Sequence, residues 1–232
     1  MGHSHSSIVC SWMLLLCVGL LLSTVRADAA PYTKLIVFGS IWEDMGNNWD
    51  ARRNPESSLY MQGRRTNGKN YTEHLAEKLR VPALQPSGDG GMNYAWGTSS
   101  ELTTEIDKTL RIQIDDFEAD LGGEPADPEA LYIVNGHQGH SPDSVIVAME
   151  RLAELGAVYF VTLGKIEPLM LIGGPNTIYD ESSTGMDRIG AWSTAAGDYS
   201  TALGNVVGKA RTQEGLTIVL ISARAWVSKA SG

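Results

Sequence analysis

The sequence predicts an α/β protein in which a parallel sheet is covered by helices on both faces. Four short runs are apolar throughout rather than alternating between apolar and polar residues, which is typical of strands buried on both faces. Segments with helical periodicity separate these runs, so strands and helices alternate along the chain. The 232 residues, of which 43% are hydrophobic and 19% charged, suffice for one domain with its own core.

The predicted strands are rich in β-branched and aromatic residues, which strands favour. Turn residues or helical segments bound each of them. The four runs are Lys34–Phe38, Leu131–Val134, Val158–Val161 and Leu216–Ile221. No internal repeat or low-complexity linker interrupts the chain, which favours one domain after the N-terminal segment.

The predicted helices carry recognisable start and stop signals. Asn70 and Glu73 have the spacing of a capping box, and Pro82 ends the first helix. In the second helix, Gly122 follows apolar residues at helical spacing. Those residues are Leu110, Ile114, Phe117 and Leu121.

The third helix is predicted to begin at Ser141 as cap with Pro142 at its first position, and to end at Gly156. A fourth, weaker helix is expected within Trp192–Arg211, where glycines lower the helical propensity. Asn70-Tyr71-Thr72 is also a glycosylation sequon, relevant in a eukaryotic secretory pathway.

The N-terminal segment has the features of a signal peptide. The apolar run Ile8–Leu22 is short for a membrane-spanning helix, and Ala27-Asp28-Ala29 fits cleavage before Ala30. The predicted organisation is therefore residues 1–29 as signal peptide and 30–232 as one domain. The protein is expected to be secreted (extracellular or periplasmic), without a stable membrane span after cleavage. An uncleaved anchor is the alternative.

The positions of the cysteines and the net charge argue against several classes of function. Both cysteines, Cys10 and Cys17, lie in the predicted signal peptide, so the mature chain would lack disulfides and thiol chemistry. The formal net charge is −9 and no basic patch gathers, which argues against nucleic acid as a partner. Nucleotide-binding glycine motifs are absent, and no cofactor is predicted. Adjacent Glu43 and Asp44 are expected to form a solvated acidic turn rather than a glycosidase pair.

The segment Phe38–Asn48, FGSIWEDMGNN, resembles the first block of the GDSL (SGNH) family of serine ester hydrolases, which reads roughly FGDSxSDxGNN. Three further segments resemble later family blocks in the same order: Gly63–Lys69, Gly91–Gly97 and Ala130–Gln138. The resemblance implies a three-layer α/β/α sandwich with a parallel sheet. It also implies acyl transfer through an acyl-enzyme, with a small-molecule ester, a lipid or an acetylated sugar as substrate.

The position of the family's nucleophilic serine is altered. Aligned without gaps, that serine falls on Ile41, whose side chain has no nucleophilic atom. If the turn is one residue shorter before the serine and one residue longer after it, Ser40 becomes the nucleophile. The alternative is that Ser40 only caps the following turn.

The resemblance also suggests the oxyanion hole, which stabilises the charge that develops on the carbonyl oxygen. Gly97 falls on the glycine that donates its N–H, although a tight turn alone would also explain a glycine. Gln138 replaces the family asparagine as a side-chain donor, or is a polar loop residue. Four matching residues have expected structural roles near the site: Gly39, Asp44, Gly46 and Asn47. The carboxylate of Asp44 is expected to bind the backbone of the loop after the nucleophile.

The general base is missing from the expected place. The family's Asp-x-x-His block should follow the strand Leu216–Ile221, but no histidine occurs there, so the domain is expected to be C-terminally shortened. His137 and His140 are possible substitute bases, and His74 is expected to be an exposed helix residue. The His137-x-x-His140 pair has no third ligand, so no metal site is predicted.

Two hypotheses follow. The first is a secreted GDSL-family serine ester hydrolase of the lipase, acyl-esterase or acetyl-esterase class, with full or impaired catalysis. The second is a catalytically inactive GDSL-fold protein or fragment, a pseudoenzyme candidate that acts as a ligand-binding module. Ligand binding without turnover would favour the second.

Overall fold

The computed structural model describes residues 30–48, 60–61, 63–97, 109–136, 141–164 and 197–221. Contacts divide the chain into two units, Met1–Pro31 and Tyr32–Gly232, and every element below belongs to the second. The predicted signal peptide and the site candidates His137, Gln138 and His140 lie outside the described residues.

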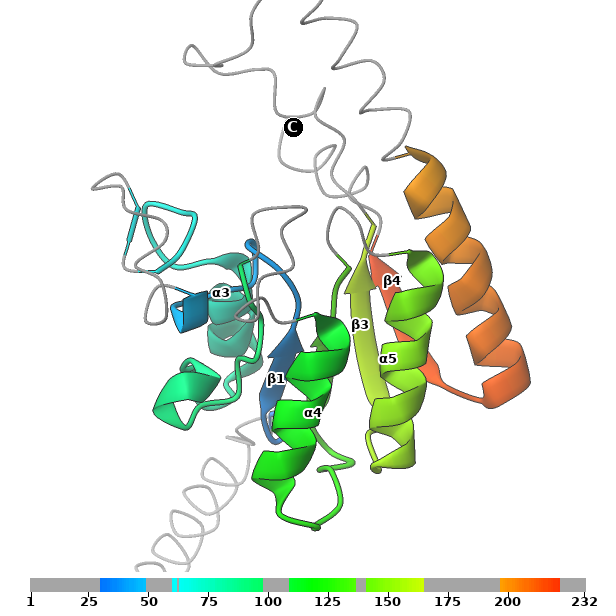
Figure 1. Ribbon diagram of the computed structural model, residues 1–232, viewed down its shortest axis with the longest axis horizontal. Coiled ribbons are helices and arrows are strands. Elements are labelled where there is room, and N and C mark those ends of the chain that lie inside the picture. Colours follow the sequence, from blue (N-terminus) through cyan, green and yellow to red (C-terminus); the bar gives the residue numbers. More distant parts are fainter. Residues whose placement is uncertain are drawn as a thin grey trace, which may run out of the picture. The chain divides into compact units, whose positions relative to one another are not determined.

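A four-stranded parallel sheet forms the centre of the second unit (Figure 1). Its strands are β1 (Leu35–Phe38), β2 (Leu131–Val134), β3 (Tyr159–Leu163) and β4 (Thr217–Ile221), paired in the order β1-β2-β3-β4. All residues of β1 and β2 are buried. The predicted α/β class with a parallel sheet is therefore confirmed, with β3 beginning and ending later than the sequence suggested.

Residues 92–96 run parallel to β1 along its other edge. The Val37 N–H donates to the Met92 carbonyl at 3.0 Å, the Tyr94 N–H to the Val37 carbonyl at 2.8 Å, and the Trp96 N–H to the Gly39 carbonyl at 3.2 Å. After β1 the chain first places residues 92–96 along one edge of that strand. It then crosses over to form β2 along the other edge. The order of strands reverses between β1 and β2, which is where open parallel sheets form a crevice at their carboxyl ends.

Alternate strand residues point to opposite sides of the sheet, and described helices lie on both faces. Ala76 of α3 (Tyr71–Leu79) packs with Leu35, Val37 and Ile133 on one face. On the other face lie α4 (Leu110–Leu121), α5 (Pro142–Glu154) and the helix formed by residues 197–209. This arrangement is compatible with a three-layer α/β/α fold.

Local capping explains where the helices begin and end. Both halves of the predicted capping box are present at α3, where Asn70 accepts from Thr72 and Glu73 N–H groups and Glu73 accepts from the Asn70 N–H. Ser141 caps α5 through the Ser144 N–H, with Pro142 following it. Gly122 ends α4 with a φ of 60°, a left-handed conformation that costs glycine little. These three sequence predictions are confirmed.

Two short elements complete the description: the 3₁₀ turn η1 (Ser87–Asp89), and the π-helical turn η3 (Ala210–Glu214), which extends the helix of residues 197–209. Among the described residues, no helix combines the length and the apolar character that a membrane crossing requires.

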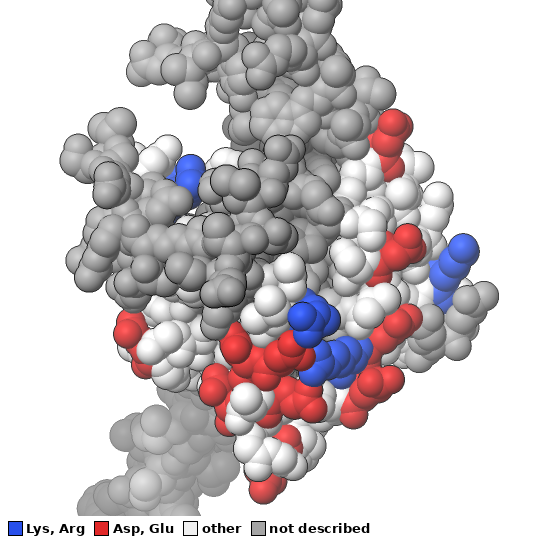
Figure 2. Space-filling view, viewed as in Figure 1, with Lys and Arg blue, Asp and Glu red and all other residues white. Residues whose placement is uncertain are grey.

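The surface over α4 and α5 mixes acidic and basic side chains, as Figure 2 shows. Asp115 contacts both Arg111 and Arg151, and Arg151 also reaches Glu118. These ion pairs are substantially exposed, so each contributes little to stability.

Candidate active site

Ser40 and Asn135 lie where the order of strands reverses. Gly39 and Ser40 directly follow β1, and Asn135 directly follows β2. The two strands pair in register, with Phe38 opposite Val134, so the residues that follow them meet at one edge of the sheet. Both side chains are buried, at 3% exposure for Ser40 and 4% for Asn135.

The hydroxyl of Ser40 contacts a carboxylate. Its Oγ donates to Glu43 Oε2 at 3.1 Å, and its backbone N–H donates to the same oxygen at 2.9 Å. The Ser40 carbonyl in turn accepts the N–H groups of Glu43 and Asp44, at 3.1 and 2.8 Å. A tight turn after β1 therefore brings the Glu43 carboxylate back onto Ser40.

Glu43 is buried and hydrogen-bonded on both carboxylate oxygens. Its Oε1 accepts from the Tyr71 hydroxyl at 2.8 Å and from Asn135 Nδ2 at 2.9 Å. Its backbone carbonyl accepts from Asn70 and Asn93. In the part of the chain that the structure describes, the partners of this carboxylate are all uncharged.

Tyr71 and Asn135 fix the direction in which the Glu43 carboxylate points. Asn135 Oδ1 accepts the Leu163 N–H at 2.8 Å, which leaves its Nδ2 to donate to Glu43 and to the Tyr71 oxygen at 2.7 Å. Burial raises the pKa of Tyr71 well above the ordinary tyrosine value, and the Glu43 carboxylate raises it further. The Tyr71 hydroxyl therefore stays protonated and donates a hydrogen bond to Glu43 Oε1.

The prediction that Glu43 and Asp44 form a solvated acidic turn is wrong. Each is only 3% exposed. The turn after β1 folds both side chains inward, where hydrogen-bond donors from other segments compensate for the loss of water. Adjacent carboxylates usually stay solvated because they repel each other, and here they point to separate sets of donors.

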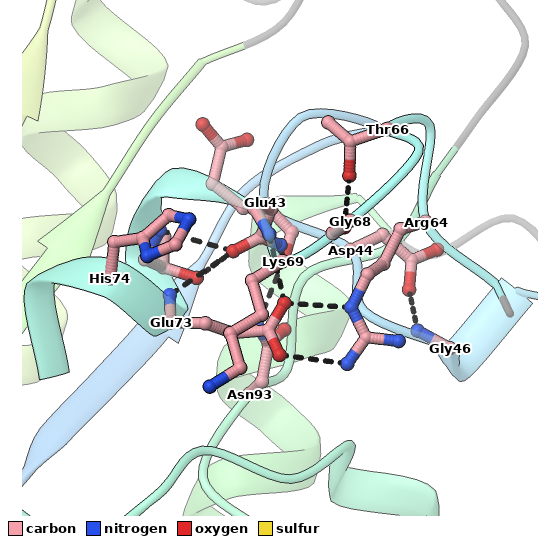
Figure 3. Close-up of polar contacts among 12 residues, drawn as sticks. Glu43, Asp44, Gly46, Arg64, Thr66, Gly68, Lys69, Glu73, His74 and Asn93 are labelled. Atoms are coloured by element: carbon pink, nitrogen blue, oxygen red, sulfur yellow. Dashed lines mark hydrogen bonds and ion pairs between the residues drawn. The ribbon is translucent and has the colours of Figure 1, made fainter. Parts of the chain in front are cut away.

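Asp44 organises the loop that follows the turn. It accepts the N–H groups of Gly46 at 2.9 Å, Asn48 at 3.2 Å and Gly97 at 2.7 Å. Figure 3 shows Asp44 pointing to Gly46. Burial raises the pKa of Asp44 to about 6, against the opposing effect of these backbone hydrogen bonds.

Gly97, the predicted oxyanion donor, has its N–H directed at Asp44. A Cβ at this position would lie 2.9 Å from Asp44 Oδ2, so the close approach requires glycine. Gly97 can bind an oxyanion only after this hydrogen bond is exchanged for one to the substrate. The other predicted donor, Gln138, is outside the described residues.

Asn47 ties the loop to the segment beside β1. Its Nδ2 donates to the carbonyls of Asn93 at 2.7 Å and Ala95 at 3.0 Å, and its Oδ1 accepts the Gly88 N–H at 3.1 Å. Gly46, which precedes it, is buried. Asp44 and Asn47 together hold the loop in place against residues 93–97.

The segment Gly63–Lys69 is attached to α3 through an ion pair. Arg64 Nε lies 2.7 Å from Glu73 Oε2 and its Nη2 lies 2.8 Å from Oε1, a two-point contact visible in Figure 3. Burial raises the pKa of Glu73, but hydrogen bonds from Arg64 and the Asn70 N–H outweigh it and hold the pKa below the ordinary value. This carboxylate, unlike Glu43, is neutralised by a cation.

Histidine does not reach Ser40 in the described part of the chain. His74 lies on α3 with 60% of its side chain exposed and Nδ1 3.6 Å from Glu77, which confirms the exposed position expected for it. His137 and His140 are not described. No three histidine, cysteine, aspartate or glutamate side chains gather as a metal site would require, as far as the described residues go.

The sequence prediction did not place Glu43, Tyr71 or Asn135 at the site, although it named Gly39, Asp44 and Gly97 there. Ser40 and Glu43 have the Ser-x-x-Glu spacing of a helix-capping pair, which would have suggested their contact. Asn135 directly follows a predicted strand, a position that favours a site residue once the strand order is known. No local signal in the sequence points to Tyr71.

No protein-family model matches this chain, and no curated protein matches it either. The resemblance to the GDSL family thus depends on the sequence segments quoted above. The function must be inferred from those segments and from the geometry around Ser40.

Proposed function

We propose that this protein is a secreted serine ester hydrolase of the GDSL type, with Ser40 as nucleophile. The observation that carries the proposal is the position of the Ser40 hydroxyl, at the end of β1 where the strand order reverses, 3.1 Å from a buried carboxylate oxygen. Small acyl esters, lipids and acetylated sugars are the substrate class. The four family-like segments support the three-layer GDSL sandwich as the fold.

In the proposed reaction, Ser40 Oγ attacks the ester carbonyl carbon and the alcohol leaves, giving an acyl-enzyme that water hydrolyses. Gly97 and Gln138 donate hydrogen bonds to the oxyanion. An unassisted serine hydroxyl is a poor nucleophile at neutral pH, so a proton acceptor beside Ser40 is required.

A second candidate function is binding of an acyl or sugar ligand without turnover. Two backbone donors that a hydrolase would direct at an oxyanion are engaged by the chain's own carboxylates: Ser40 N–H by Glu43, and Gly97 N–H by Asp44. A site whose donors are already satisfied stabilises a new charge less well.

Fluorophosphonate labelling of the purified protein, with the adduct located by mass spectrometry, tests the proposal. We expect a label on Ser40 that is lost in Ser40→Ala and kept in Ile41→Ala. Full labelling of Ser40→Ala would refute Ser40 as nucleophile. A folded wild-type protein that takes no label but binds acyl or sugar ligands would favour the second function.

A further inference from the structure

We infer that the Glu43 carboxylate accepts the proton of Ser40, so that a serine–glutamate pair performs the nucleophilic step without a histidine. This inference rests on the proposed function and assigns the proton acceptor that the family resemblance leaves missing. Its basis is the geometry of Glu43 and its partners.

The contact between the two side chains suits proton transfer. Ser40 Oγ lies 3.1 Å from Glu43 Oε2, within the distance that a general base needs. The Ser40 N–H donates to the same oxygen at 2.9 Å and so holds the carboxylate beside the hydroxyl. Gly39 makes room for this arrangement, since a Cβ there would lie 2.7 Å from Oε2.

A third group orients the base, as in other nucleophile–base pairs. The Tyr71 hydroxyl and Asn135 Nδ2 both donate to Glu43 Oε1, at 2.8 and 2.9 Å. Asn135 is itself fixed by the Leu163 N–H of β3. Contacts from α3, from the residue after β2 and from β3 therefore hold Oε1, which leaves Oε2 directed at Ser40.

Among the described residues, no cation contacts the Glu43 carboxylate. Its partners are the neutral groups of Ser40, Tyr71 and Asn135. Glu73 differs, because Arg64 contacts both of its oxygens. The Glu43 carboxylate is therefore not engaged in an ion pair in place of its contact with Ser40.

The proton balance closes within the pair. As Oγ forms its bond to the acyl carbon, the Ser40 proton passes to Glu43 Oε2, and Glu43 then gives it to the departing alkoxide oxygen as the ester C–O bond breaks. In the second half, Glu43 takes a proton from the attacking water and returns it to Ser40 Oγ as the acyl group leaves. No other reactant is needed.

A purely structural role for Glu43 is the competing explanation, since Ser-x-x-Glu is a capping spacing and Glu43 accepts the Ser40 N–H. Glutamine also occurs in that capping position. In Glu43→Gln the side-chain oxygen can still accept the Ser40 N–H and the side-chain volume is kept, while an NH2 group takes the place of the oxygen that accepts from Tyr71 and Asn135. The amide cannot take up a proton from serine.

The experiment measures the rate of fluorophosphonate labelling at Ser40 in the full chain, for wild type, Glu43→Gln and the control Glu118→Gln. Glu118 is an exposed residue of α4 that pairs with Arg151, so its substitution makes the same chemical change outside the contacts around Ser40. We expect labelling of Glu43→Gln to be at least about a hundredfold slower, the contribution of a general base, and the control to match wild type.

The outcomes separate the inference from the proposed function. Equal rates in wild type and Glu43→Gln would overturn the inference and leave Ser40 as nucleophile. Absence of label on folded wild type would overturn both. Circular dichroism and thermal unfolding show whether Glu43→Gln is folded.

If Glu43→Gln does not fold, chemical modification of wild type decides. Diethyl pyrocarbonate acylates imidazoles and would block a histidine base, but it leaves a carboxylate able to accept a proton. We expect wild type with acylated histidines, verified by mass spectrometry, to be labelled at Ser40 at the rate of the untreated protein. A loss of about a hundredfold that hydroxylamine reverses would overturn the inference.

Discussion

The side-chain amide of Gln113 binds both backbone polar groups of Gly39. Its Oε1 accepts the Gly39 N–H at 2.9 Å, and its Nε2 donates to the Gly39 carbonyl at 2.8 Å. Gln113 is 1% exposed and lies on α4, so this helix fixes the end of β1 immediately before Ser40. A buried glutamine on an otherwise apolar helix face is thereby explained.

Substituting Gln113 by leucine should destabilise the protein by about 2 kcal/mol. The Gly39 N–H would lose the acceptor described here in a buried site, while its carbonyl would keep the Trp96 N–H. Urea unfolding measures the change, and Gln85→Leu, at an exposed position, is the control. Equal stability of Gln113→Leu and wild type would contradict the role given to this amide.

Asp44 should make the free energy of unfolding fall as pH rises from about 4 to about 6. Its pKa is raised from 3.8 to about 6 in the folded protein, so the folded state binds the proton more tightly than the unfolded state does. The stabilisation that comes from this proton decreases as the pH rises from about 4 to about 6. Above about pH 6, Asp44 no longer changes the free energy of unfolding with pH. The difference between 3.8 and about 6 corresponds to about 3 kcal/mol.

Comparing urea unfolding of wild type and Asp44→Asn across the window isolates this titration. The asparagine variant cannot ionise, so the stability difference between the two proteins should change with pH by up to that amount. A difference that is independent of pH would show that Asp44 titrates alike in both states.

The sequon at Asn70 should be unoccupied in folded protein from a eukaryotic secretory host. Asn70 is 2% exposed, its Nδ2 donates to the Glu43 carbonyl at 3.1 Å, and its Oδ1 accepts from Thr72 and Glu73 N–H groups. A glycan on Nδ2 has no room there. Peptide mapping before and after endoglycosidase treatment measures occupancy, and a folded product glycosylated at Asn70 would contradict the burial.

Gly91→Ala should destabilise the protein by about 3 kcal/mol, at the upper end for overpacking. A Cβ at Gly91 would lie 2.2 Å from the Gln85 carbonyl oxygen, a backbone atom that cannot move aside without shifting the segment beside β1. Gly68→Ala is the matched control, because a Cβ there meets nothing within 4 Å. Thermal unfolding of both variants checks the prediction, which fails if the two are equally stable.

Local interactions made much of the fold predictable. The capping box at Asn70, the Ser141-Pro142 start of α5 and the Gly122 end of α4 depend on contacts within one helical turn. The buried strands β1 and β2 were visible as continuous apolar runs. Boundaries were less certain where the signal is diffuse, as for β3, which includes Thr162 and Leu163.

The surroundings of Ser40 were not predictable in the same way. Ser40 and Glu43 are three residues apart, but whether Glu43 faces solvent or the protein interior depends on Tyr71, Asn93 and Asn135, which come from distant segments. The sequence pattern alone favoured a solvated turn.

The sequence by itself determined the strands, the helix ends and the position of Ser40 after β1, because those features follow from side-chain periodicity and capping within a few residues. Only the tertiary structure decided that Glu43 is buried against Ser40 and that Asn135 lies beside it. That outcome depends on residues 92–96 and β2 taking opposite edges of β1, a choice made by the packing of the whole sheet rather than by any one segment.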